Sequence, residues 1–148
     1  MKNFRVGNII EANGHLTVIY ECCNDLIWFY DNKGNVDFLK IYDERIKDVE
    51  LSNFLLDKMF KEELKKGFDN LYYVWIVNKV LHIEIREATS GFNILCNGFE
   101  MFKIFSVREL QNVYALLYEN PIIGCGERSD SKTPGELDEK LRNIFKLG

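Results

Sequence analysis

Short apolar runs separated by turn-forming residues fill the first forty residues of the chain. They predict β-strands at residues 5–10, 16–21, 26–30 and 36–39. The separators are rich in Asn, Asp and Gly, which adopt a positive φ or bond their own backbone and so favour tight turns. Residues 16–21 alternate between two sets of side chains, whereas residues 26–30 are apolar on both faces and are expected near the centre of the sheet. The pattern predicts a four-stranded antiparallel meander, either a curled sheet or an SH3-like barrel.

An amphipathic helix and a second meander are expected next. Ser52 can cap a helix with apolar residues at helical spacing, whose charged end is expected to close at Gly67. Strands are then predicted at residues 72–77, 80–86, 92–96 and 100–105, joined by turns that contain Asn, Ser or Gly. The fold class is therefore α+β, with two small antiparallel β-meanders, each followed by an amphipathic helix.

The C-terminal third carries the strongest helix signals. Ser106 and Glu109 form a capping box, and the apolar residues that follow recur at helical spacing until Pro121. A polar segment at 124–134 predicts a linker, and Thr133 with Glu136 predicts a second capping box at the start of a helical tail. The expected organisation is a compact α+β body at 1–123, with subunits 1–67 and 68–123, a linker at 124–134 and a C-terminal helix at 135–148. A helix this short is marginal alone in water, so it must dock on its own body or on a second copy.

Composition narrows the function classes. The 148 residues are 47% hydrophobic and carry a formal net charge of -4, so the chain can bury a core but lacks the basic face that a nucleic-acid partner requires. We see no apolar run of signal-peptide length and no window of roughly 18 apolar residues that would predict a membrane span. We expect the protein to stay in the cytoplasm, with its four cysteines as reduced thiols because their spacing does not suggest a disulfide framework.

Candidate catalytic chemistry is sparse. Cysteines and histidines lack the paired spacings of a zinc site, and we predict no catalytic residues, no metal site and no cofactor. His82, Glu84 and Arg86 lie at alternate positions of one expected strand, so they could form an acid/base group on one polar face. The simpler interpretation is a solvated sheet face with cross-strand pairs. A small metal-dependent nuclease or hydrolase built on such residues stays open as an alternative.

Aromatic residues supply the better candidate for binding. Trp28 and Tyr30 lie in one predicted strand, and Tyr73 and Trp75 lie in another. Such stripes are usually core, but neighbouring residues of a strand point to opposite faces, so part of each stripe can form an exposed apolar patch. We predict a binding surface made from these four residues with His82, Glu84 and Arg86, where a host protein or a small nucleotide ligand would bind.

Residues 106–117 resemble the "HELQNLYFAL" motif of small uncharacterised proteins carried by phages, prophages and mobile elements of Bacteroidetes. Residues 5–10 are similar to that family's "IGNYV" first strand, and residues 49–56 to its "IPLTEEILL" segment; Arg108 stands where the motif has His. The resemblance implies an accessory protein that acts inside a bacterial host, where binding and inhibiting a host factor is a common task. It assigns no active-site residue.

The leading hypothesis is a non-enzymatic binding protein of phage or mobile-element origin that inhibits a host defence system. Besides the nuclease or hydrolase, one further alternative is a self-assembling structural protein that forms a homodimer through its C-terminal helix.

Overall fold

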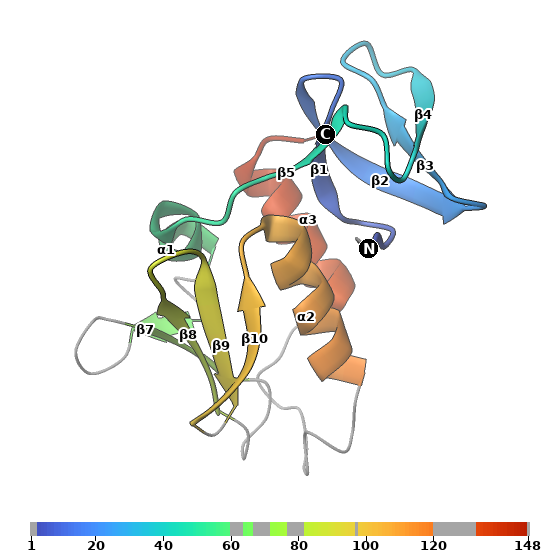
Figure 1. Cartoon of the computed structure of the whole chain (residues 1–148). Helices are drawn as coiled ribbons and strands as arrows, with labels where there is room; N and C mark the ends of the chain where they lie inside the picture. Colours follow the sequence, from blue (N-terminus) through green and yellow to red (C-terminus); the bar gives the residue numbers. More distant parts are fainter. Residues whose placement is uncertain are drawn as a thin grey trace.

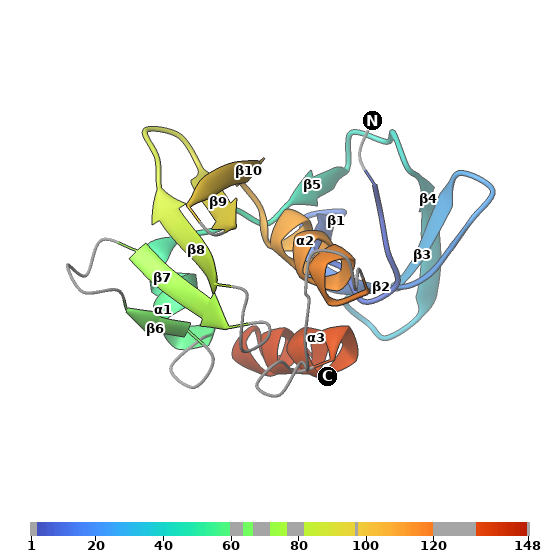
Figure 2. The same ribbon diagram turned by 90° about the horizontal axis from the view of Figure 1, so that it is seen from below.

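The chain folds into two antiparallel β-sheets joined by helices, and Figures 1 and 2 show helix α2 (Val107–Glu119) between the sheets. The computed structural model describes residues 3–59, 64–66, 72–76, 82–96, 98–119 and 133–147. Within these residues the structure confirms the predicted α+β class, with a curled half-barrel sheet, a second small sheet and three helices.

The N-terminal half-barrel is a five-stranded antiparallel sheet in the order β4-β3-β2-β1-β5. Its strands are β1 (Ile9–Ala12), β2 (His15–Cys23), β3 (Leu26–Tyr30), β4 (Val36–Lys40) and β5 (Ile46–Asp48). Both residues of each two-residue hairpin turn have positive φ: Asn13 and Gly14 at 51° and 81°, Asn24 and Asp25 at 49° and 62°. Turns of this kind match the right-handed twist of the strands, so the predicted hairpins form where the sequence places them.

The concave side of the half-barrel holds its own apolar cluster, which consists of Ile10, Ala12, Ile19, Ile27, Phe29, Leu39 and Ile46. Strand β2 contributes through Thr17 and Ile19, which are buried, while Leu16 on the opposite face is 37% exposed. The predicted alternation is therefore confirmed from Leu16 to Tyr20 but fails at Glu21, where the register with β3 shifts, and the more polar of the two residue sets lines the interior.

The second sheet has the order β10-β9-β8-β7-β6. Its strands are β6 (Leu64–Lys66), β7 (Tyr72–Ile76), β8 (His82–Glu87), β9 (Phe92–Cys96) and β10 (Phe99–Ile104). Helix α1 (Asn53–Met59) begins after Ser52, whose hydroxyl accepts a hydrogen bond from the Leu55 amide as expected for a cap.

One larger apolar core connects both sheets with the helices. It includes Ile9 of β1, Ile85 and Ile94 of the second sheet, and Leu110 and Tyr114 of α2, each at most 1% exposed. Because β1 contributes Ile10 to the half-barrel cluster and Ile9 to this core, the two clusters share a strand. The two halves are thereby packed against the same helix.

The C-terminal helix α3 (Pro134–Ile144) is part of this core. Thr133 caps it as predicted, and its Leu137 and Leu141 are 2% and 0% exposed among residues of α1, α2 and the second sheet. The tail helix thus packs on its own chain in this structure. The homodimer through this helix and the division into units at 67, 123 and 134 stay predictions.

Three expectations about local structure were wrong. The first strand does not cover residues 5–10, because the chain turns at Gly7, with a φ of +96°, and β1 begins only at Ile9. The helix after Ser52 does not continue to Gly67, because Leu64–Lys66 form strand β6 paired with β7. The half-barrel has a fifth strand, since Ile46–Asp48 pair with β1. Both added strands are three residues long, too short for an alternation pattern to reveal.

Candidate binding surface

The convex face of the half-barrel carries aromatic side chains on three neighbouring strands. The β3/β4 register pairs Trp28 with Phe38 and Tyr30 with Val36, and their neighbours Ile27 and Phe29 are buried on the concave side. Directly opposite residues of an antiparallel pair lie on the same face, so these four side chains form two adjacent rows.

A β-bulge in β2 extends both rows. The register shifts between Ile19, which pairs with Phe29, and Glu21, which pairs with Trp28. The extra residue, Tyr20, contacts Tyr30, so Tyr20 and Glu21 both lie on the convex face despite being adjacent in sequence. The first row is therefore Tyr20, Tyr30 and Val36, and the second is Glu21, Trp28 and Phe38.

The rings of each row are in contact. The Tyr20 and Tyr30 centroids are 5.1 Å apart with the planes inclined by 30°, and those of Trp28 and Phe38 are 4.8 Å apart with the planes inclined by 41°. These are ordinary separations for aromatic pairs, which hold each other in place. The result is two pairs of contacting rings in neighbouring rows of one sheet face, which together form a platform.

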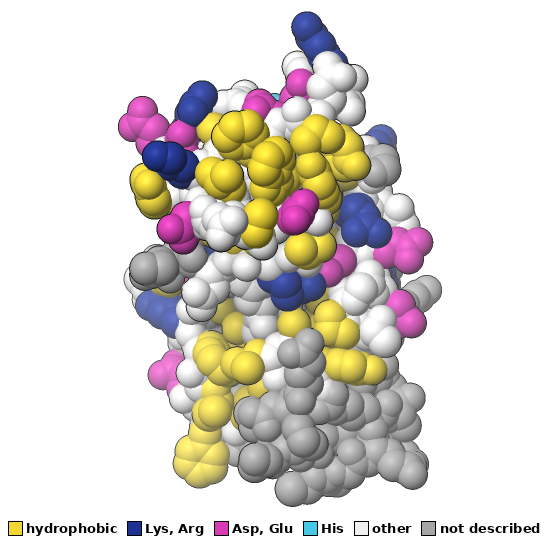
Figure 3. Space-filling view, turned by 90° about the vertical axis from the view of Figure 1, so that its right-hand side faces the viewer, with side chains coloured by type: hydrophobic (Ala, Val, Ile, Leu, Met, Phe, Trp, Pro, Cys, Tyr) yellow, Lys and Arg dark blue, Asp and Glu magenta, His cyan; other side chains and the backbone are white. Residues whose placement is uncertain are grey.

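This platform is exposed. Tyr30, Val36 and Phe38 are 51%, 54% and 50% exposed, while Tyr20 and Trp28 are partly buried beside them. Figure 3 shows hydrophobic side chains gathered in the upper part of this side of the molecule, with charged side chains around them. We call Tyr20, Trp28, Tyr30, Val36 and Phe38 the aromatic face. Within the described residues, the Trp28 Nε1–H is buried without a hydrogen-bond partner, an arrangement that folding does not favour.

Two charged residues flank the aromatic face on opposite sides. Glu21 is exposed and lies opposite Trp28 on the β2 side. Lys40 follows Phe38 by two residues on β4, and its Nζ lies 6.0 Å from the Tyr42 ring centroid. Burial, and then the proximity of Tyr30 and Glu21, raise the pKa of the Tyr20 hydroxyl, so this phenol is neutral at pH 7.

The structure places the predicted site residues on two separate sheets. Trp28 and Tyr30 belong to the aromatic face, whereas Tyr73, Trp75, His82, Glu84 and Arg86 lie on β7 and β8 of the second sheet. The side chains of Tyr73, Trp75 and His82 are outside the described residues. Glu84 and Arg86 lie on one face of β8, as expected, with Oε2 of Glu84 2.9 Å from Nε of Arg86. This is the partly exposed ion pair of a solvated sheet face.

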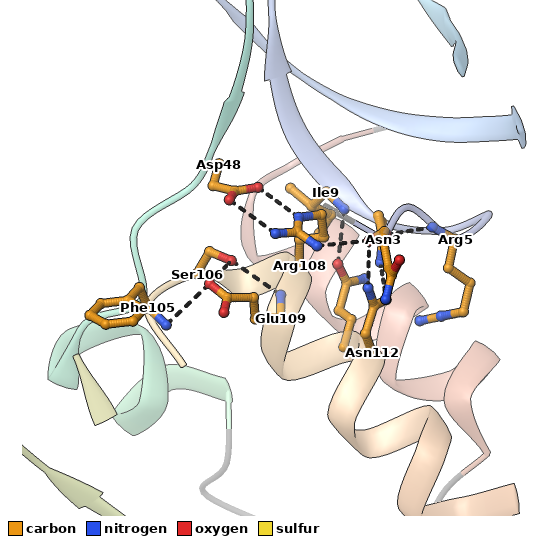
Figure 4. A network of polar contacts seen from close by, with 11 residues as sticks. Asn3, Arg5, Ile9, Asp48, Phe105, Ser106, Arg108, Glu109 and Asn112 are labelled. Carbon is orange, nitrogen blue, oxygen red and sulfur yellow. Dashed lines mark hydrogen bonds and ion pairs between the residues drawn. The ribbon is translucent and has the colours of Figure 1, made fainter. Parts of the chain in front are cut away.

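The helix motif that carries the family resemblance performs structural tasks (Figure 4). The Ser106 hydroxyl accepts a hydrogen bond from the Glu109 amide at 3.1 Å, and the Glu109 carboxylate reaches back to Ser106 Oγ at 3.0 Å and to the Phe105 amide at 3.3 Å. Leu110 is fully buried. The predicted capping box is thus confirmed and fixes the start of α2.

The polar residues of the same motif anchor the N-terminal segment. Gln111, fully buried, accepts a hydrogen bond from the Ile9 amide at 2.9 Å and donates to the Gly7 carbonyl at 2.9 Å. Asn112 accepts from Asn8 and donates to the Asn3 carbonyl, both at 2.9 Å. These bonds tie α2 to the strand that enters the half-barrel.

Arg108 completes the anchor at the other end of the network. Its Nε and Nη2 donate to the Asp48 carboxylate at 2.8 and 3.2 Å, and its Nη1 donates to the Asn3 carbonyl at 2.7 Å (Figure 4). The guanidinium also lies 5.3 Å from the Phe4 ring centroid. The Arg108 side chain is only 7% exposed and its guanidinium donors are bonded to Asp48 and Asn3. It therefore stabilises the contact between α2, β5 and the N-terminal segment and has little capacity to bind a ligand.

A groove of about 690 Å³ lies between the start of α1, the β8/β9 turn and the start of α2. Among its polar side chains, Asp48 is bonded to Arg108, Glu87 to Asn53, and Ser106 to Glu109. Among the residues that line it are no histidine, cysteine or lysine. Within the described part of the chain no group of three or more His, Cys, Asp or Glu side chains is placed to hold a metal ion.

Sequence reasoning missed three members of the aromatic face. Val36 and Phe38 could have been found by counting outward from the turn at residues 31–35, because that register puts Phe38 opposite Trp28. Tyr20 could not, because alternation alone does not say which side of β2 faces outward, and the bulge that puts Glu21 beside Tyr20 is not visible in the pattern.

Comparison with known proteins gives no match to a family model, a curated protein or a solved structure. Helices in the described residues are too short or too polar to cross a membrane.

Proposed function

We propose that the protein is a non-enzymatic binding protein and that the aromatic face is the surface on which it binds a partner protein. The observation that carries the proposal is the half-exposed platform formed by Tyr30, Val36 and Phe38 next to the contacting rings of Tyr20 and Trp28. Exposed clusters of large apolar side chains are costly in water and mark interaction sites, and aromatic residues dominate the energy of such interfaces.

A protein partner fits this surface better than a nucleotide does. Within each row the rings are in contact, so a base cannot insert between Tyr20 and Tyr30 or between Trp28 and Phe38 as the side chains are arranged. The carboxylate of Glu21 lies beside the platform and the whole chain has a net charge of -4, so phosphate groups would be repelled. A polar rim with an apolar centre is the usual anatomy of a protein interface.

The family resemblance supplies the setting of the proposal. An accessory protein of phage or mobile-element origin would work in the cytoplasm of a bacterial host, and its partner would be a host protein, such as a component of a defence system. The helix motif behind the resemblance contributes to folding through Glu109, Gln111 and Asn112. The proposed binding surface lies elsewhere, on β2, β3 and β4.

The test is a quantitative capture experiment from a bacterial lysate with three immobilised proteins: the wild type, the double variant Tyr30→Ser/Phe38→Ser, and the control Phe54→Ser/Phe99→Ser. The control removes two phenylalanines that are even more exposed, 64% and 75%, but lie on α1 and β10. Mass spectrometry then compares the proteins retained by each.

We expect at least one protein to be retained by the wild type and by the control but lost from the Tyr30→Ser/Phe38→Ser variant. Equal unfolding midpoints for the two double variants would show that the loss reflects the surface and not the fold. Retention of the same proteins by all three would reject the proposal, and so would a turnover activity abolished by a single polar substitution such as Glu84→Gln.

A further inference from the structure

We infer that the aromatic face recognises an arginine side chain in an extended segment of the partner protein, with the guanidinium stacked on the rings and paired with Glu21. This inference rests on the proposed function, because it names the chemistry that the same surface binds. Three features of the surface lead to it: ring spacing, the position of the carboxylate, and the area.

Ring spacing distinguishes a platform from a cage. A cage for an ammonium group needs rings far enough apart to admit the cation between them, with each centroid within about 6 Å of the charge. Here the rings of each row touch, at 5.1 and 4.8 Å. Such a surface accepts a flat group laid across it, and of the two side chains that are always cationic at neutral pH, arginine and lysine, only the arginine guanidinium is planar and weakly hydrated enough to stack.

The carboxylate of Glu21 gives the platform its preference for a cation. Glu21 lies opposite Trp28, where Cβ atoms of opposed residues are about 5 Å apart, so a guanidinium lying on Trp28 or Tyr20 comes within reach of its oxygens. Lys40 carries the opposite charge at the far side of Trp28, beyond Leu26 on the same face. This polarity orients a bound segment, with its arginine toward β2 and any acidic residue toward β4.

The area of the aromatic face argues for a peptide segment as the occupant instead of a second copy of the chain. Three half-exposed residues and two partly buried rings expose roughly 400 Å², if full side chains expose about 150–250 Å² each. A stable dimer interface buries about 800 Å² per partner. The free edge of β4 also resists strand pairing with another copy, because the Phe38 amide is already bonded to the Asp37 carboxylate at 2.8 Å.

The experiment uses the full chain and three synthetic peptides, acetyl-Gly-Ser-Arg-Ser-Gly-amide and its lysine and citrulline counterparts. Citrulline keeps the planar shape and removes the charge, whereas lysine keeps the charge and removes the plane. The readout is the NMR signal of the Trp28 indole N–H, identified by its absence in Trp28→Phe. Trp75 on the other sheet provides an internal reference.

We expect the arginine peptide to shift the Trp28 signal and to bind roughly five-fold more tightly than either counterpart. Glu21→Gln should reduce this preference to less than about two-fold, while Glu139→Gln, an exposed carboxylate on α3, should leave it unchanged. An unshifted indole signal, or equal affinity for arginine and lysine, overturns the inference.

A single-stranded oligothymidylate tests whether the aromatic face binds nucleic-acid bases instead of an arginine side chain. If it binds the aromatic face, and binds more tightly to Glu21→Gln, the surface recognises bases and the inference is overturned. Failure of the arginine inference can be distinguished from failure of the proposed function. A partner that is lost with Tyr30→Ser/Phe38→Ser but kept by Glu21→Gln would leave the binding surface in place and remove only the role of arginine.

Discussion

Replacing Gly7 with alanine tests directly whether α3 docks on the strand entry of its own chain. Gly7 has a φ of +96°, and a Cβ built there would lie 2.5 Å from Oδ2 and 3.1 Å from Cγ of Asp138 on α3. Gly14 has a similar φ of +81° but nothing within 4 Å of its Cβ. Both glycines have a positive φ that strains an alanine, so the larger part of the difference between the two substitutions reports the contact with Asp138.

The magnitude follows from the bonds that Asp138 makes. Its carboxylate, 5% exposed, accepts from Nη1 and Nη2 of Arg5 at 2.9 and 3.0 Å and from Nε2 of Gln111 at 2.7 Å. Hydrogen bonds to charged groups contribute about 1.5–3 kcal/mol each, and the new methyl group would displace the carboxylate from some of them. We expect Gly14→Ala to cost about 1 kcal/mol of unfolding free energy and Gly7→Ala about 3–5 kcal/mol.

The assay is urea denaturation followed by circular dichroism at several protein concentrations. In an Asp138→Ala background the steric term disappears, so Gly7→Ala should then cost no more than Gly14→Ala. Docking on a second copy would make the difference depend on protein concentration. Costs for the two glycines that agree within about 0.5 kcal/mol in the wild-type background would refute the reasoning.

Three further perturbations test other features of the structure. Gln111→Leu should lower the unfolding free energy by about 3–5 kcal/mol in the same assay, because it leaves the Ile9 amide and the Gly7 carbonyl unpaired. The control Leu116→Gln exchanges the same two residue types at an exposed position of α2 and should change the unfolding free energy by less than about 0.5 kcal/mol. Burial raises the pKa of the Cys22 thiol, so its alkylation by iodoacetamide, followed by peptide mass spectrometry, should be slow at pH 7 and still accelerate above pH 9. Hydrogen bonds from Arg45 lower the pKa of Asp43 to about 2. The contribution of this carboxylate to stability is therefore complete above its ordinary pKa of 3.8 and is lost as the pH falls toward 2. A pH titration followed by NMR of the Asp43 carboxyl group should have its midpoint at about 2, and Arg45→Gln should move that midpoint toward 3.8.

Local sequence signals predicted most of the fold. Hairpin turns with Asn, Asp and Gly fixed the order and pairing of strands, since Asn13-Gly14 and Asn24-Asp25 take the positive φ values that two-residue hairpins require. Capping boxes likewise marked where α2 and α3 begin. These features depend on residues three or four positions apart, which a linear sequence displays.

Long-range pairing could not be read in the same way. Strand β5, Ile46–Asp48, pairs with β1 about 36 positions earlier in the chain. In the buried polar network, Gln111 is bonded to Gly7 and to Asp138, which are also distant in sequence. For such contacts the sequence offers only polar residues on an amphipathic helix, which look like a solvated face. Burial of Gln111 and Arg108 became visible only when β1, β5 and α3 were placed around α2.

Only part of the aromatic face was predicted, because its other members are brought together by pairing between strands. Trp28 and Tyr30 stand out as aromatic residues on one strand, but the complete face depends on cross-strand partners on β4 and on a bulge in β2. Alternation also left open which side of β2 would be buried, and the less apolar set, with Thr17 and Ile19, lines the half-barrel. This choice is what leaves Tyr20 on the outside.

The decisive quantity is the dissociation constant of a captured partner, measured by titration calorimetry against three forms of the protein. We predict that Tyr30→Ser/Phe38→Ser weakens binding at least tenfold, because truncation of aromatic contacts at an interface centre commonly costs 1–2 kcal/mol or more for each residue. Phe54→Ser/Phe99→Ser should stay within about twofold of the wild type, even though those two rings are more exposed. Equal constants for the two double variants would contradict the assignment of the binding surface to the convex face of the half-barrel.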